Sequence, residues 1–299
     1  MKKTKRMNMR AFTILALLTA ILMVFSFTPL GTIPIGPLSI TLNIIPIAIA
    51  AIALGPIGGL IIGSIFGLLS FLQCLSIGVP SGMGIVLFGI NPFLAFVQRF
   101  VPRALDGFLV GLIYNSISKL FKKHDAKLLT LVFGAIIGAI LVAAGIITAL
   151  TGAEKNRLAV EAGIVEGADA NPGTAFIIFG VIAAVVGLVL AVLAILNYLN
   201  KKEVKSKLMP ECFIAGFLSA FLNTVFFMTA LVVLFGNTEY VQKLMDGRNI
   251  FAFIIAFVGV NALVEMVVST VISGLVGTAL HGAKVLPLKH GLIIPAERK

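Results

Sequence analysis

The chain has 299 residues, of which 59% are hydrophobic and only 12% are charged, and its mean hydropathy is +1.12. So few charged residues cannot cover a water-soluble globule, so the composition indicates a polytopic membrane protein. The net charge of +11 comes from short basic tracts beside apolar runs, which mark membrane topology, and we expect no nucleic-acid partner.

The first part of the chain predicts three membrane helices. A basic N-terminus precedes an apolar run at residues 11–30, which lacks a small-residue cleavage site and is expected to stay as an uncleaved helix. Apolar runs at 40–54 and 57–77 follow, and the Gly-Pro-Ile-Gly-Gly turn between them is expected to reverse the chain. Glycines at four-residue spacing in the third run predict close packing against a neighbouring helix: Gly59, Gly63 and Gly67.

Residues 78–100 are weakly apolar and are interrupted by glycine and proline. Irregular backbone at membrane depth is tolerated only where protein or a watery cavity covers it, so we expect a partly re-entrant loop on the outer side. Pro102 is then well placed to open the fourth helix, which runs to about residue 120.

The sequence around this helix start carries the first candidate site. Gln98, Arg99 and Arg103 lie among apolar residues, where ionisable groups cost several kcal/mol unless they are paired, solvated or used. If the helix extends back through Pro102, Arg99 and Arg103 share a face and can grip a carboxylate together. In the alternative, Arg103 pairs with Asp106 and Arg99 extends to lipid headgroups.

Four more apolar runs, at 128–150, 174–199, 213–235 and 250–280, bring the predicted total to eight helices. With both termini in the cytoplasm, most of the 23 basic residues fall inside, as the positive-inside rule requires. The arginines then lie near the outer side.

The last two runs carry polar residues near the middle of the membrane. Asn223, Asn261 and Glu265 reach this depth, and the last two share a helix face. They predict the floor of a ligand pocket lined by amides and one acid. The alternative is hydrogen bonding between helices, with Glu265 protonated or paired. Asn91 is a weaker candidate that a turn also explains.

The chain lacks the motifs of the common catalytic classes. It has no phosphate-binding loop, zinc-protease motif, nucleophile elbow or acidic metal-binding cluster. We therefore expect no enzyme activity, no cofactor and no metal, and any ATP hydrolysis must come from partner subunits.

Five features in a fixed order carry a family resemblance. They are Ala16-x-x-x-Ala20; Ile45-Pro46 with the Leu54-Gly55-Pro56-Ile57-Gly58-Gly59 turn; Asn91-Pro92 with Val101-Pro102-Arg103-Ala104-Leu105-x-Gly107; Asn223-Thr224; and Asn261-x-x-x-Glu265. In this order they resemble the substrate-binding S components of energy-coupling factor (ECF) vitamin transporters, over residues 11–121 and 211–281.

The resemblance implies an all-α polytopic plasma-membrane protein whose six-helix core comprises residues 1–121 and 211–299. Residues 122–210 depart from the family pattern and are expected to form an inserted transmembrane helical hairpin. An S component captures a vitamin or precursor at its outer face, here pantothenate first and folate second. It topples against a transmembrane coupling subunit, and two partner ATPases drive release inside. Ala16 and Ala20 would meet the coupling subunit, or alternatively pack within the bundle.

The sequence is also compatible with two other functions. A self-sufficient secondary transporter of a small organic anion should show inverted repeats, and no convincing repeat of the Pro/Gly pattern occurs in the second half. A non-transport membrane assembly protein would have no need for Arg99, Arg103 and Glu265 together. Copurification of a coupling subunit with two ATPases separates the ECF function from both.

Overall fold

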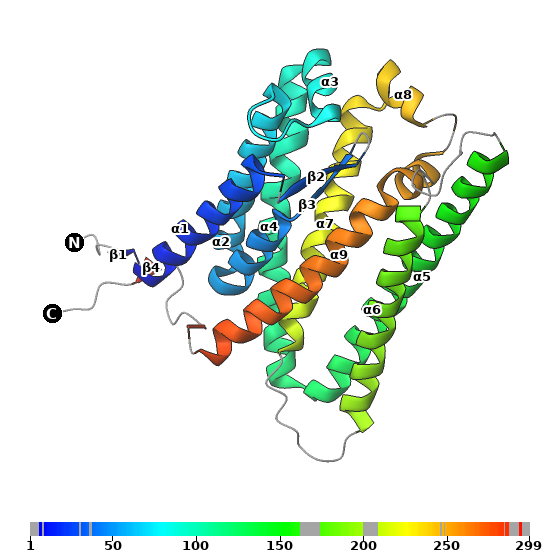
Figure 1. Cartoon of the computed structure of the whole chain (residues 1–299). Coiled ribbons are helices and arrows are strands. Elements are labelled where there is room, and N and C mark those ends of the chain that lie inside the picture. The colour runs from blue at the N-terminus through cyan, green and yellow to red at the C-terminus, as the bar shows by residue number, and fades with distance from the viewer. Residues whose placement is uncertain are drawn as a thin grey trace.

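The computed structural model describes residues 6–7, 9–29, 31–35, 38–161, 174–199, 209–245, 247, 249–283, 285–286 and 293–294. These residues form a bundle of long helices (Figure 1). Six helical segments in this part of the chain are long and apolar enough to cross a membrane, which confirms the predicted class of helical, multi-pass membrane protein. The predicted basic tract at 201–207 and the basic C-terminal end lie outside the described residues.

Helix α1 (Met9–Phe27) lies at one side of the bundle and packs on α2. Leu18 and Leu22 face inward and join the cluster that α2 builds. Ala16 and Ala20 are exposed, so these small residues do not pack within the bundle. The alternative that they serve internal packing is therefore wrong.

A short β-hairpin that the sequence did not predict follows α1. Strand β2 (Thr32–Ile35) pairs antiparallel with β3 (Leu38–Thr41), with Thr32 opposite Thr41. The hairpin lies across the bundle near α7 and α9 (Figure 1). A second pair joins β1 (Arg6–Met7) to β4 (Ile293–Ile294), so both ends of the chain meet.

Helix α2 (Ile44–Leu72) contains most of the next two predicted runs, 40–54 and 57–77, and is broken at Gly55. Gly55 has a φ of 71°, a left-handed conformation that glycine adopts without strain. Ile45 and Ile49 from the first half share a buried cluster with Ile62 and Phe66 from the second half. The two halves therefore fold back on each other, as the turn motif predicted.

The predicted start of the next helix is wrong. After the short helix η1 (Gln73–Leu75) and α3 (Gly82–Ile90), α4 runs over Pro92–Lys123. The Asn91 side-chain oxygen accepts the Leu94 N–H at 3.1 Å and caps α4, and Pro92 fits its first turn. Pro102 lies inside α4, where its missing N–H leaves only the Gln98 carbonyl without its helical donor.

The glycine strip packs α2 against α4, as predicted. A Cβ on Gly59 would overlap the Gly107 carbonyl, and one on Gly63 would overlap the Arg103 carbonyl. Contacts this close between backbones leave no room for a side chain. The strip therefore fixes the height at which α4 holds its arginines.

Helices α5 (Ala126–Glu161) and α6 (Thr174–Leu199) form a tight pair. Their backbones meet at glycines, because Cβ atoms on Gly138 and Gly145 would lie 2.6 Å and 2.5 Å from the carbonyls of Gly187 and Gly180. The pair lies on the far side of the bundle from α1 (Figure 1). Helices α7 (Pro210–Phe235) and α9 (Ile250–Gly282) lie between this pair and helices α1, α2 and α4.

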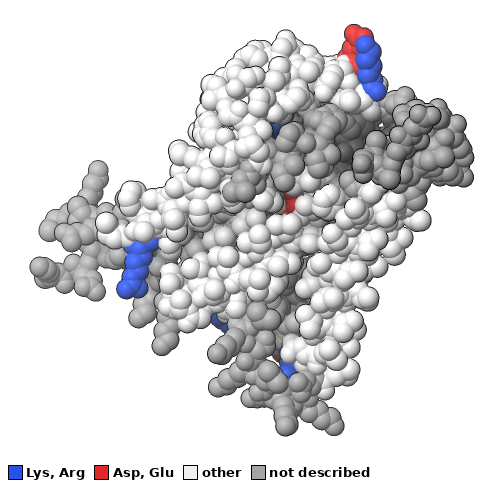
Figure 2. Space-filling view, viewed as in Figure 1, with Lys and Arg blue, Asp and Glu red and all other residues white. Residues whose placement is uncertain are grey.

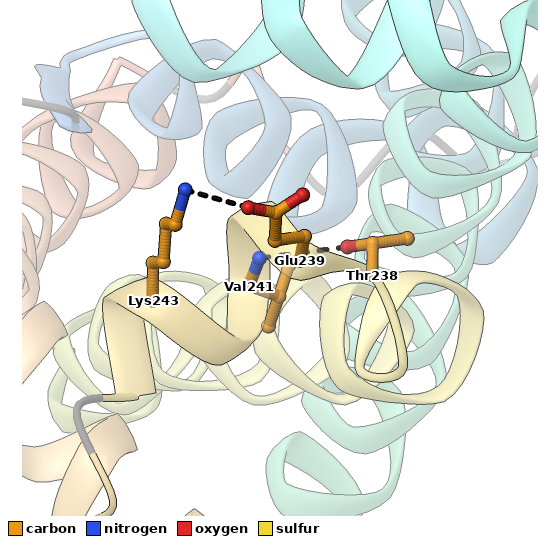
Figure 3. A network of polar contacts seen from close by, with 4 residues as sticks. All are labelled: Thr238, Glu239, Val241 and Lys243. Atoms are coloured by element: carbon orange, nitrogen blue, oxygen red, sulfur yellow. Dashed lines mark hydrogen bonds and ion pairs between the residues drawn. The ribbon is translucent and has the colours of Figure 1, made fainter.

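The short helix α8 (Glu239–Met245) connects α7 to α9. The Val241 N–H donates to the Thr238 hydroxyl at 3.4 Å, and Lys243 pairs with Glu239 at 2.7 Å on the exposed side (Figure 3). Val241 is fully buried in a cluster with Met83 of α3. Helix α8 therefore covers the same end of the bundle as α3.

Candidate substrate-binding site

Arg99 and Arg103 lie one turn apart on the inner face of α4, with exposed fractions of only 5% and 4%. Because α4 starts at Pro92, the two arginines share a face, as predicted for an extended helix. Arg103 Nη1 donates to the Arg99 carbonyl at 2.8 Å, and Arg99 Nη2 donates to the Ser81 hydroxyl at 3.0 Å.

Two aromatic rings enclose the guanidinium groups. Arg103 Cζ lies 4.6 Å from the ring centroid of Phe66 on α2 and 5.1 Å from that of Phe227 on α7. Arg99 Cζ lies 5.2 Å from the same Phe227 ring. Ring faces attract a cation and exclude water from it, so an anion that reaches these arginines meets weakly screened charge.

Neither arginine forms a salt bridge with the residues that the structure describes. Asp106 accepts a hydrogen bond from the Ser219 hydroxyl at 3.1 Å and does not pair with Arg103. Arg99 points into the bundle and not toward lipid headgroups, so both parts of the alternative role are wrong. Within the described part of the chain, the Nε atoms of both arginines lack a hydrogen-bond partner. A buried unpaired cation is costly, and an anionic ligand would remove that cost.

Glu265 on α9 is also buried, with an exposed fraction of 6%. Its Oε1 accepts the Thr41 N–H at 2.7 Å, so the carboxyl group ties α9 to strand β3. Glu265 therefore anchors the β-hairpin to α9, a role that the sequence did not indicate.

The packing of α4 on α7 brings Asn223 to the same level. The helices run antiparallel, because Asp106 bonds Ser219 while Ala95, further toward the start of α4, packs near the end of α7. One turn beyond Ser219 is Asn223, which therefore lies opposite Arg103. Asn223 is buried, and its side-chain oxygen has no hydrogen-bond partner among the described residues.

Helix α9 contributes Asn261 to the polar residues near Arg103. Ser269 donates to the Gly216 carbonyl at 2.9 Å, and this antiparallel register puts Asn261 level with Asn223. Glu265 lies one turn further along α9. The predicted group of mid-membrane polar residues is thus brought together between α7 and α9.

The remaining two predicted site residues, Gln98 and Asn91, differ in burial and in hydrogen bonding. Gln98 is fully buried on α4, and within the described residues neither amide atom has a hydrogen-bond partner. Asn91 is only half-buried, and its oxygen is occupied in capping α4. The structure thus gives Asn91 a local helix-capping role away from the arginine pair.

Sequence reasoning missed several residues of this site. Phe66 and Phe227 are two of 23 phenylalanines, and nothing in the pattern distinguishes them. Ser81 precedes Gly82-Met83-Gly84 and could have been noticed as a helix cap. Burial raises the pKa of the Tyr240 phenol on α8 above its ordinary value, and the nearby Arg99 charge partly opposes this. Tyr240 is therefore a neutral neighbour of Arg99.

In the described part of the chain, no three His, Cys, Asp or Glu side chains come together to hold a metal ion. The chemistry that the site offers is binding: two cations, two aromatic walls and three amide side chains. Figure 2 shows a face of the molecule that is largely uncharged among the described residues, with small isolated blue and red patches.

The family model for the substrate-specific component of ECF transporters matches residues 8–160. This chain belongs to that family. The matched residues of this substrate-specific component include α4 with its two arginines, whereas α7 and α9 lie beyond the match. The resemblance that the sequence motifs suggested is thereby confirmed.

A curated relative is the "Pantothenate transporter PanT" of Leuconostoc mesenteroides subsp. mesenteroides. It is 35% identical over 114 residues, which cover 38% of this substrate-specific component and 52% of the relative. The chain thus spans about half the length of the curated relative that it matches.

Proposed function

We propose that this substrate-specific component captures an anionic vitamin or precursor at its outer face for ATP-driven import through partner subunits. Pantothenate is the first candidate and folate the second. The observation that carries the proposal is the buried pair Arg99 and Arg103, which has no acidic partner in direct contact among the described residues. The name of the curated relative supports pantothenate.

The chemistry of pantothenate suits the groups around the arginines. Its single carboxylate would accept hydrogen bonds from the arginine pair. Its hydroxyl and amide groups would bond the side chains of Gln98, Asn223 and Asn261. Among the described residues, both amide atoms of Gln98 and the side-chain oxygen of Asn223 have no hydrogen-bond partner. Phe66 and Phe227 would pack against its apolar part. Asn91 and Glu265 remain predicted site residues, and we expect them to lie at the edge of the bound ligand.

The proposed topology has eight passes through the plasma membrane, with both termini in the cytoplasm. Residues 122–210 would be an inserted hairpin on a six-helix core. A transmembrane coupling subunit would meet α1 at Ala16 and Ala20, whose exposure supports this, and two ATPase subunits would supply the energy. No catalysis by this chain is required.

Gentle copurification from its native membrane tests the proposal. The chain should bring down a transmembrane coupling subunit and two ATPases, and mass spectrometry should identify pantothenate in the preparation. A chain that purifies without these subunits under mild extraction, and that imports an anion when reconstituted alone, would be a secondary transporter instead.

A further inference from the structure

The tip of the Arg99 side chain is enclosed by the segment that precedes α4, which is η1, the following turn and α3. Arg99 Nη2 donates to the Ser81 hydroxyl at 3.0 Å. The same hydroxyl accepts the Gly84 N–H at 3.2 Å and so caps α3. Ser81 therefore links the first turn of α3 to the Arg99 guanidinium.

Gly84 leaves the space in which the guanidinium tip lies. A Cβ on Gly84 would lie 2.8 Å from Arg99 Nη2, 2.7 Å from Cys74 Sγ and 3.0 Å from Ser81 Oγ. Ordinary carbon contacts are 3.5–4.0 Å, so the Cys74 sulfur and the Arg99 nitrogen would both have to move, and the Ser81 oxygen would have to give slightly.

Of these three groups, the Arg99 guanidinium can move furthest. Cys74 is 3% exposed, and its thiol donates to the Ser70 carbonyl at 3.5 Å, so its short side chain is held. The Ser81 oxygen is fixed by its helix-capping bond. The guanidinium, in contrast, is at the end of a long flexible side chain whose rotamers are numerous.

We propose that Gly84, Ser81 and Cys74 are positioning residues that hold the Arg99 guanidinium beside Phe227 and thereby set the preference of the site for a carboxylate. The inference rests on the proposed function, since it takes the Arg99 pair as the carboxylate-binding element. It assigns the segment before α4 a part in selectivity without contact between that segment and the cargo.

The test compares Gly84→Ala with Gly82→Ala and Gly89→Ala in the purified full-length chain. All three glycines lie on α3, and a Cβ on Gly82 or Gly89 would meet no described atom within 4 Å. Each variant is titrated with pantothenate and with its neutral alcohol analogue, pantothenol. We expect Gly84→Ala to weaken pantothenate binding about tenfold or more and to leave pantothenol binding unchanged, as loss of a hydrogen bond to a charged group predicts. Both control variants should bind each compound like the wild type.

A second variant removes the hydrogen bond without adding volume. Ser81→Ala should also weaken pantothenate binding more than pantothenol binding. The inference is overturned if Gly84→Ala binds pantothenate like the control variants, or if it loses both compounds equally, because equal loss indicates general distortion. Absence of pantothenate binding by the wild type would instead reject pantothenate as the ligand of the proposed function, so the two failures are distinguishable.

Discussion

Arg99 and Arg103 carry permanent charges in the interior of a membrane bundle, and their closest neighbours are aromatic rings and backbone or hydroxyl oxygens. Such placement costs stability that no described salt bridge recovers. It is useful where a ligand supplies the missing negative charge. The sequence revealed this part of the site because a charged residue within an apolar run is conspicuous. The surrounding aromatic and hydroxyl groups are ordinary residues that only the fold brings there.

Replacement of Arg103 by lysine tests the geometry of the pair. Lysine keeps the charge but loses the planar fork and the stacking on Phe66 and Phe227. We expect Arg103→Lys to weaken pantothenate binding at least about tenfold, measured by titration of the purified chain. The control is Lys243→Ala, which removes an exposed cation of α8 and should change nothing (Figure 3). Wild-type affinity in Arg103→Lys would show that only net charge matters.

Glu265 should matter through the strand that it anchors. Alanine at this position removes the acceptor of the Thr41 N–H, whereas glutamine keeps an acceptor oxygen. Loss of the acceptor of a buried N–H costs about 1–3 kcal/mol, so amide exchange in residues 31–43 should accelerate about fivefold or more in Glu265→Ala. Glu265→Gln should recover part of the protection. Hydrogen exchange followed by mass spectrometry measures this, and equal exchange in wild type and Glu265→Ala would refute the anchoring role.

At the scale of elements, long apolar runs and the Gly-Pro turn predicted most helices and the reversal at Gly55. The start of α4 and the short elements differ from the prediction. Helix α4 begins ten residues before Pro102, because the cap at Asn91 and Pro92 outweighs an interior proline that the helix tolerates. The short helices α3 and α8 lie where the sequence predicts loops. The sequence predicts a turn and a helix start in place of the β2–β3 hairpin, since strands of four residues have too short a pattern to distinguish.

The contact of α2 with α4 should be sensitive to a single methyl group. A Cβ on Gly59 would overlap the backbone carbonyl of Gly107, and a backbone carbonyl cannot move aside as a side chain can. We expect Gly59→Ala to cost about 1–3 kcal/mol and to lower the thermal stability of the detergent-purified chain. Gly89→Ala, which has free space among the described residues, is the matched control. A melting temperature equal to that of the control would mean that the helices are further apart than described.

At the scale of the whole molecule, the bundle has two different sides. Helix α1 lies on one side with its exposed alanines, and the α5–α6 pair covers the other (Figure 1). The pair reaches the core through Leu141 and Ala183, which share a cluster with Leu263 of α9. The α5–α6 pair thus leaves the exposed face of α1 uncovered by described residues.

Bulky residues on α1 should separate coupling from binding. We expect the double variant Ala16→Leu with Ala20→Leu to lose copurification of the coupling subunit and to lose vitamin uptake. Pantothenate binding by the isolated chain should persist, because both residues lie outside the site. Ala143→Leu, at an exposed alanine of α5, should leave coupling intact. Normal uptake by the double variant would rule out this coupling surface.

Equilibrium titration of the purified wild-type chain with pantothenate, without any partner subunit, tests the role of the arginine pair most directly. We predict saturable binding at one site per chain, with a clear preference over neutral pantothenol because of the buried arginine pair. Absence of saturable binding, or equal affinity for the two compounds, would contradict a carboxylate-binding role of the pair.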